Sequence, residues 1–247
     1  MLKFKSIRMT VPVVLAAAII LAAGGGAIAS NMGFKLNKPI VNAALTSAIG
    51  DNWTSIPYNN PYGTFGGFCN QTGLRTVVGS QARITKINPA TNLPTTANCG
   101  TAGANTIPLP TDGTAILIEQ PVNTAAVNSI IIVGSHDPAK NVSVLPFCNT
   151  TQATPAYCAS APASGQGNFW ASIAYHTTSF TFKDFCNQHQ LSRTITSTAS
   201  LTRINATTGL PQSSTCFSGA ATGINLVLGE AVQIKEVAAR NFIPAHY

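Results

Sequence analysis

Hydrophobic and polar residues alternate in short runs along most of the chain, and turn-forming residues separate these runs. Apolar, β-branched and aromatic side chains alternate with polar or small ones in segments 52–58, 81–88, 114–119, 128–133, 169–175, 199–205 and 230–235. Such alternation over four to eight residues is typical of half-buried β-strands. Asn, Pro, Thr and Gly fill the following segments 88–92 and 205–209, which is typical of turns. The pattern predicts many short strands.

Two segments have helical spacing instead. The sets with i, i+3, i+4 spacing are Phe65, Phe68 and Cys69, and Phe182, Phe185 and Cys186. Thr64 and Thr181 precede them as candidate N-caps, and Asp184 falls at the third helical position, where a carboxylate favours the helix dipole. Short strands with one short helix per domain predict a mainly β fold, packed as a β-sandwich or small barrel.

The chain also matches itself when it is displaced by 117 residues. Eleven positions between 52 and 74 are identical to their counterparts: Trp53, Ser55, Ile56, Tyr58, Thr64, Phe65, Phe68, Cys69, Asn70, Gln71 and Leu74. The match continues through 87–88, 93–94 and Cys99, and after a one-residue slip through 113–116. We therefore predict a tandem duplication of one domain.

The cysteines fit this duplication. Six are present, at positions 69, 99, 148, 158, 186 and 216. An even number in an exported chain is typical of disulfide bonds, although six cysteines allow 15 pairings. The equal spacing within the two copies favours Cys69 with Cys99 and Cys186 with Cys216, which leaves Cys148 to pair with Cys158.

These features divide the chain into four parts. Residues 1–29 form a predicted signal peptide, 30–147 a first β domain, 148–167 a disulfide-looped linker and 168–247 a second β domain. The second copy ends early, and we favour residues 142–147 as its first strand, equivalent to 34–40. In the alternative, the second copy lacks a strand and accepts one from a neighbouring subunit, which would allow strand-exchange polymerisation.

The leader explains part of the unusual composition. It has a basic start, an uncharged apolar run and the small-residue pattern Ala27-Ile28-Ala29, as a secretory signal does. A retained membrane anchor is the alternative, because 19 uncharged residues are just long enough to span a bilayer. The leader carries three of the 14 basic residues and none of the seven acidic ones, so cleavage lowers the net charge from +7 to +4.

Charge is scarce in the remaining chain. Only 9% of all residues are charged, and no stretch clusters Lys or Arg with aromatic residues. The sequence thus predicts no nucleic-acid partner, and contact with a membrane only through the leader if it is not cleaved. Separated acids and four histidines form no known catalytic or metal-binding motif, so we expect no cofactor and no metal. Ser135-His136-Asp137 has the residue types of a hydrolase triad, but adjacent residues do not converge in space, which favours a turn.

Three residues are candidates for ligand binding. His136 and His246 occupy equivalent positions in the two copies, and Tyr62 lies among aromatics that could form a glycan platform. Trp53 and Trp170 repeat between the copies, which favours core packing for them. Tyr62 lacks an aromatic counterpart, since the equivalent residue is Ser179.

The segments 30–35 and 52–58, together with the Phe-Cys helix, resemble uncharacterised secreted paired-repeat proteins of Gram-negative bacteria. The resemblance covers most of the chain after the leader, implies no activity and transfers no functional residue. We expect an exported, non-catalytic structural or adhesive protein, periplasmic, extracellular or on the cell surface, with self-association or cell-surface components as partners. A carbohydrate- or small-ligand-binding module is the alternative, with a glycan as partner, and a hydrolase is a third hypothesis.

Overall fold

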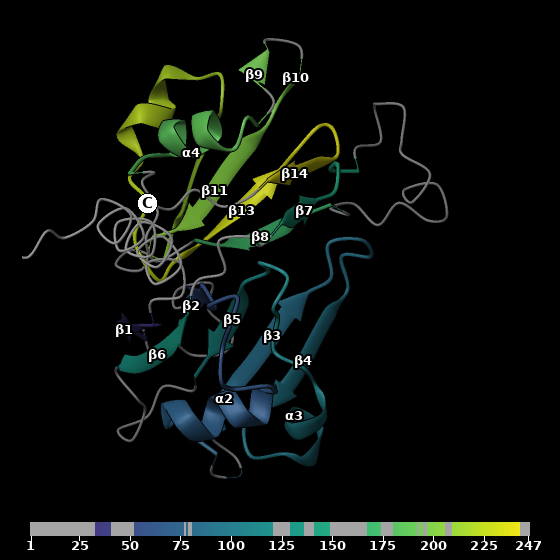
Figure 1. The fold of residues 1–247 in the computed structure, drawn as a ribbon, viewed down its shortest axis with the longest axis vertical. Coiled ribbons are helices and arrows are strands. Elements are labelled where there is room, and N and C mark those ends of the chain that lie inside the picture. Colours follow the sequence, from purple (N-terminus) through teal and green to yellow (C-terminus); the bar gives the residue numbers. More distant parts are fainter. Residues whose placement is uncertain are drawn as a thin grey trace, which may run out of the picture. The chain divides into compact units, whose positions relative to one another are not determined.

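The mainly β architecture expected from the sequence is present in the computed structural model (Figure 1). The structure describes residues 33–40, 52–76, 78, 81–120, 129–135, 141–148, 167–173, 180–191, 193–194, 197–205 and 209–242. The predicted signal peptide, Cys158 and most of the predicted linker lie outside the described residues. All described residues belong to one unit, Gly33–Tyr247. We call its described residues up to 135 the first half and those from 141 the second half.

The two halves contain similar elements. The first half has β1 (Gly33–Pro39), β2 (Asn52–Thr54), α2 (Phe65–Thr72), β3 (Arg83–Ile87), β4 (Pro94–Asn98), α3 (Ala102–Thr106), β5 (Ile116–Glu119) and β6 (Ser129–Ser135). The second half has β7 (Val142–Val144), β8 (Phe169–Ser172), α4 (Phe182–Gln188), β9 (Arg193–Thr194), β10 (Ser197–Thr198), β11 (Ser200–Ile204), β12 (Pro211–Thr215), the 3₁₀ helix η2 (Gly219–Gly223), β13 (Ala231–Lys235) and β14 (Arg240–Phe242).

Each half is built on a four-stranded antiparallel sheet with the same strand order. The orders are β4-β3-β5-β2 and β12-β11-β13-β8. The registers also correspond, because Arg83 lies opposite Asn98 and Glu119, as Ser200 lies opposite Thr215 and Lys235. Two similar sheets with matching registers indicate a duplication.

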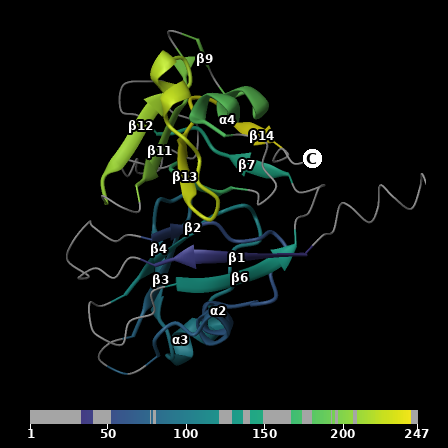
Figure 2. The same ribbon diagram turned by 90° about the vertical axis from the view of Figure 1, so that its left-hand side faces the viewer.

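A two-stranded ladder accompanies each sheet. Figure 2 shows β1 beside β6, and these strands pair antiparallel over seven residues. In the second half, β7 pairs antiparallel with β14. In the strand-exchange alternative, the second half would accept a strand from a neighbouring subunit. Here β7 of the same chain pairs with β14 instead.

The helices begin where the sequence predicts. The Thr64 side chain accepts a hydrogen bond from the Gly67 N–H at the start of α2. Thr181 and Asp184 form a reciprocal capping box at the start of α4, which satisfies two backbone N–H groups. A second short helical segment in each half, α3 or η2, was not predicted, so the expectation of one helix per domain is incomplete.

Disulfides hold each helix to its sheet. Cys69 of α2 bonds to Cys99, and Cys186 of α4 bonds to Cys216, as the spacing predicts. Each bridge spans 30 residues, for which the chain-entropy model gives a stabilisation of about 3–4 kcal/mol. Cys148 is also disulfide-bonded.

The halves meet through reciprocal contacts. The indole rings of Trp53 and Trp170 stack with centroids 4.0 Å apart and an interplanar angle of 3°. The Ser55 hydroxyl donates to the Glu230 carbonyl at 2.6 Å and accepts from the Ile173 N–H at 2.7 Å. The Ser172 hydroxyl makes the corresponding two bonds from the second half to the first. It donates to the Thr114 carbonyl at 3.2 Å and accepts from the Ile56 N–H at 2.9 Å. The interface therefore has the pairwise symmetry of a homodimer contact.

Two glycines permit this close approach. Gly113 and Gly229 have φ angles of +89° and +82°, which residues other than glycine rarely adopt. A Cβ atom on Gly113 would lie 2.7 Å from Val142 of β7, and one on Gly229 would lie 2.6 Å from Leu36 of β1. Each half thus needs a glycine where the first strand of the other half packs.

Candidate functional site

Tyr62, the aromatic candidate for glycan binding, is buried. Its side chain is 5% exposed, its ring contacts Phe68 edge-on at 4.9 Å, and its hydroxyl accepts the Val133 N–H at 2.7 Å. Burial raises the pKa of Tyr62, and the hydrogen bond from Val133 opposes that rise. Tyr62 therefore packs in the core and offers no exposed ring face to a sugar, contrary to the glycan-platform hypothesis.

The other predicted site residues are only partly described. His136, His246 and Asp137 lie outside the described residues. Ser135 is described, and it ends β6 with its backbone N–H and carbonyl bonded to Asn59. Of the Ser135-His136-Asp137 sequence, the structure thus places one residue, in a strand ladder.

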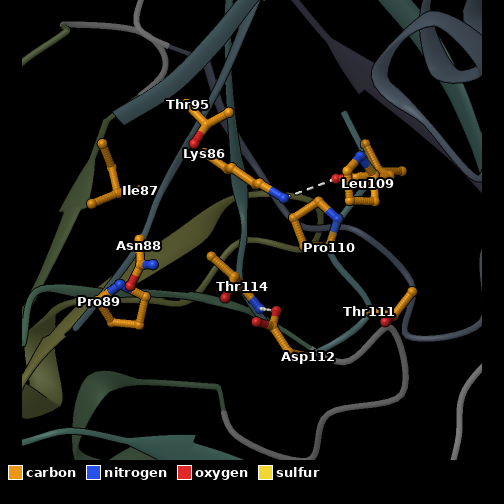
Figure 3. A pocket seen from close by; sticks show the side chains of 11 residues that line it. Lys86, Ile87, Asn88, Pro89, Thr95, Leu109, Pro110, Thr111, Asp112 and Thr114 are labelled. Carbon is orange, nitrogen blue, oxygen red and sulfur yellow. Dashed lines mark hydrogen bonds between the residues drawn. The ribbon is translucent and has the colours of Figure 1, made fainter. Parts of the chain in front are cut away.

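A pocket that the sequence did not indicate lies in the first half (Figure 3). Its volume is about 440 Å³, within the range of small-molecule sites. The lining residues come from the β3–β4 hairpin and from the segment before β5: Lys86, Ile87, Asn88, Pro89, Thr95, Pro108, Leu109, Pro110, Thr111, Asp112 and Thr114. Prolines supply much of the apolar wall, while a cation, a carboxylate and hydroxyl groups supply polar contacts.

The charged groups of this pocket stand apart in Figure 3. Lys86 projects from β3, and its Nζ donates to the Pro108 carbonyl at 3.0 Å. It also lies 5.9 Å from the centre of the Phe65 ring. The exposed Asp112 accepts the Thr114 N–H through Oδ1 at 3.0 Å. Among the described residues, no carboxylate lies within ion-pair distance of the Lys86 Nζ.

Thr114 contributes an unused hydroxyl. Its residue is 5% exposed, and its Oγ1 is buried with no hydrogen-bond partner among the described residues. A buried hydroxyl without a partner costs about 1–3 kcal/mol. A ligand group that formed a hydrogen bond with this oxygen would therefore remove this cost.

The equivalent position in the second half is filled by side chains. Arg203 corresponds to Lys86, Gln212 to Thr95 and Glu230 to Thr114, because Arg203 lies opposite Gln212 as Lys86 lies opposite Thr95. Two reciprocal β-bridges, Thr54 with Glu230 and Ala171 with Thr114, show that Thr114 and Glu230 are equivalent, because Thr54 and Ala171 are equivalent positions of the repeat.

Arg203 bonds to both of the other side chains. The Arg203 guanidinium donates to Gln212 Oε1 and to Glu230 Oε2, each at 2.8 Å. The Arg203 and Glu230 side chains, which form the ion pair, are only 11% and 9% exposed. Burial lowers the pKa of nearby Lys38, and the Glu230 carboxylate opposes that fall. The second half thus supplies from its own chain the anion that the first half lacks.

The identities between the two copies do not reveal this pocket, because they mark what the halves share. The signal lies in the differences, where Lys replaces Arg and Thr replaces both Gln and Glu. Smaller side chains without the carboxylate leave space, and the Lys86 ammonium group has no carboxylate partner among the described residues.

Two further structural features concern membranes and metals. Within the part of the chain that the structure describes, no helix combines the length and apolar character needed to cross a membrane. The described residues also contain no group of three or more His, Cys, Asp or Glu side chains placed to hold a metal ion.

No family model, no curated protein and no solved structure matches this chain. Its function is therefore inferred from the geometry of its own residues, because a fold alone does not specify a function.

Proposed function

We propose that this protein is an exported, non-catalytic structural or adhesive component of the cell surface or extracellular space. Two disulfides in a β-rich fold fit a stabilised extracellular module, since such bonds persist in oxidising compartments. The leader pattern of residues 1–29 supports export.

Exposed aromatic side chains in the second half carry the adhesive part of this proposal. Phe180 is 72% exposed and Phe217 is 51% exposed. The equivalent residues of the first half are Gly63 and Gly100. A contiguous apolar patch on the surface is typical of a contact site, whereas single exposed apolar residues are common.

The environment of Phe180 extends this apolar surface. Its carbonyl accepts the Leu226 N–H at 2.9 Å, which places it beside the segment that carries the exposed residues Val227 and Leu228. The second half thus has a surface suited to an apolar contact with another molecule, including a second copy of this chain.

Fractionation of producing cells tests the proposal. We expect the protein in the cell-surface or polymeric fraction with its cysteines oxidised, and we expect Phe180→Ser with Phe217→Ser to release it as a soluble monomer. The control is Leu93→Ser, which removes an apolar side chain that is 63% exposed in the first half. A reduced cytoplasmic protein would overturn export, and unchanged retention of the double variant would overturn the apolar contact.

A small-ligand-binding module is the second candidate function, and the pocket beside Lys86 favours it. A soluble monomer that shifts on a glycan array would support this function over assembly. Hydrolase activity that Ser135→Ala and His136→Ala both abolish would overturn the two non-catalytic proposals.

A further inference from the structure

We propose that the pocket of the first half binds a small hydroxylated carboxylate, of the size and chemistry of one hexuronate sugar. The ligand carboxylate takes the place that the Glu230 side chain has in the second half. This inference concerns one site in the first half and goes beyond the structural or adhesive role.

In the second half, the cation at this position of the sheet pairs with a carboxylate. There, Arg203 donates to the Glu230 carboxylate at 2.8 Å in a nearly buried setting. In the first half, Lys86 occupies the same strand position, and Thr114 replaces the glutamate. A carboxylate that entered the pocket would therefore restore the ion pair that the second half makes internally.

Lys86 is placed to receive such a group. Its Nζ donates to the Pro108 carbonyl at 3.0 Å, and an ammonium group has two more protons to donate. Charge-assisted hydrogen bonds to carboxylates are about twice as strong as neutral ones. The carbonyl thus holds the ammonium group at the pocket wall while leaving donors for a ligand.

The remaining polar groups favour hydroxyl groups on the same ligand. Thr114 is one of the residues that line the pocket, and its Oγ1 is buried without a hydrogen-bond partner among the described residues. Asp112 uses Oδ1 for the Thr114 N–H, and its carboxylate is exposed. A ligand hydroxyl can donate to Asp112 and either donate to or accept from Thr114.

Asp112 also sets a limit on the ligand charge. Its negative charge on another part of the wall repels groups that carry several negative charges, such as phosphate monoesters. A single carboxylate at Lys86 with hydroxyl groups toward Asp112 satisfies both charges. Sugar acids have this arrangement, whereas neutral sugars leave Lys86 without an anion.

Titration calorimetry of the purified, oxidised protein with sodium glucuronate tests the inference, with glucose as the neutral probe of the same ring size. We expect saturable binding of glucuronate at least about tenfold tighter than that of glucose. Lys86→Gln should lower the glucuronate affinity about tenfold or more, to the level of glucose. Lys35→Gln removes one exposed positive charge on β1 and should leave the affinity unchanged.

A second variant fills the site. Thr114→Glu copies the second half, so its carboxylate should pair with Lys86 and abolish glucuronate binding. If this variant fails to fold by circular dichroism, Thr95→Gln tests the same wall, because Gln212 occupies that position in the second half. It should lower the affinity by narrowing the pocket.

Several outcomes would overturn the inference. They are an absence of saturable glucuronate binding, equal binding of glucose, or full binding by a folded Lys86→Gln or Thr114→Glu variant. Surface retention of these pocket variants should equal that of the unaltered protein. For the unaltered protein, an absence of glucuronate binding with normal surface retention would count against the pocket alone, and an absence of surface retention with normal glucuronate binding would count against the adhesive role alone.

Discussion

The two halves share a backbone and differ in what they place at one position of their sheets. In the second half, Arg203 bonds to both Gln212 and Glu230, and the Arg203 and Glu230 side chains are nearly buried. In the first half, the equivalent side chains leave a pocket of about 440 Å³ lined by Thr114, whose buried hydroxyl has no hydrogen-bond partner among the described residues. The strand order and the hydrogen bonds around the two positions correspond. One half therefore shows which chemical groups stabilise this location, and the other leaves room for a ligand to provide them.

The largest predicted effect comes from making the second half resemble the first. Glu230→Thr removes the anion from Arg203, which is 11% exposed, and from the buried Lys38. Removing one partner of a buried ion pair typically costs about 3–5 kcal/mol of unfolding free energy. Urea unfolding at neutral pH measures the change.

The full transplant provides the control for this prediction. Arg203→Lys and Gln212→Thr added to Glu230→Thr should recover part of the loss, because lysine can keep its ammonium group near water. A loss below about 1 kcal/mol for Glu230→Thr alone would mean that the ion pair does not stabilise the second half.

The halves should also differ in their response to acid. His189 follows α4 as its C-cap, is 4% exposed and contacts the Phe185 ring, whereas the equivalent residue is Thr72 of α2. Burial lowers the pKa of His189 to about 4, below its value of about 6.5 in an unfolded chain. Between these values the unfolded chain binds a proton that the folded protein does not. The His189 contribution to stability is therefore complete above about pH 6.5 and falls by about 3 kcal/mol as the pH drops to 4.

Urea unfolding of the unaltered protein and His189→Thr between pH 4 and 7 measures this difference. The substitution copies the first half and should remove this part of the pH dependence. Thr72→Ser is the matched control and should leave the slope unchanged. An identical slope for His189→Thr would show that the buried imidazole is not the group responsible.

Sequence patterns predicted the strands with apolar faces but not those without them. β3, β5, β11 and β13 each carry a buried face and fall within predicted segments. The missed strands β4 and β12 have the sequences PTTAN and PQSST and are largely exposed. They form because their backbones complete the edge of a sheet, and no apolar alternation reveals such pairing.

The contacts between the halves were also beyond the sequence pattern. The repeat favoured Trp53 and Trp170 as core residues, yet it could not indicate that they stack on each other. The alternation in segment 52–58 predicts one strand, but β2 ends at Thr54. From Ser55 onward the chain bonds to the second half, with the Ser55 N–H donating to the Gly229 carbonyl at 3.1 Å. Long-range contacts therefore override the local strand preference here.

The reciprocal serines test how alike the two sides of this interface are. Ser55→Ala and Ser172→Ala each remove one hydroxyl donor and leave one buried N–H without its acceptor. Each should cost about 1–3 kcal/mol. We expect the two losses, measured by urea unfolding, to agree within about 0.5 kcal/mol. Thr202→Ala, on an exposed hydrogen bond to Ser213, is the control and should cost less. A loss at only one of the two serines would contradict the symmetry.

The smallest predicted effect concerns the hairpin turns that carry the pocket and its counterpart. Asn92 and Gly209 occupy the same turn position with φ angles of 54° and 68°. Each donates its backbone N–H at 2.7 Å to the asparagine that begins the turn, Asn88 or Asn205. Asparagine and glycine tolerate this left-handed conformation, whereas alanine loses about 1–2 kcal/mol there.

Gly209→Ala should therefore lower the unfolding free energy by about 1 kcal/mol, while Gly209→Asn, which copies the first half, should cost only a few tenths. Urea unfolding of the two variants separates these values. Equal losses of unfolding free energy would mean that a clash of the larger asparagine side chain offsets its greater tolerance of positive φ. The space around residue 209 would then limit the substitution. A smaller loss for asparagine instead means that backbone conformation governs both turns, so that the halves differ in their pocket side chains on hairpins of the same geometry.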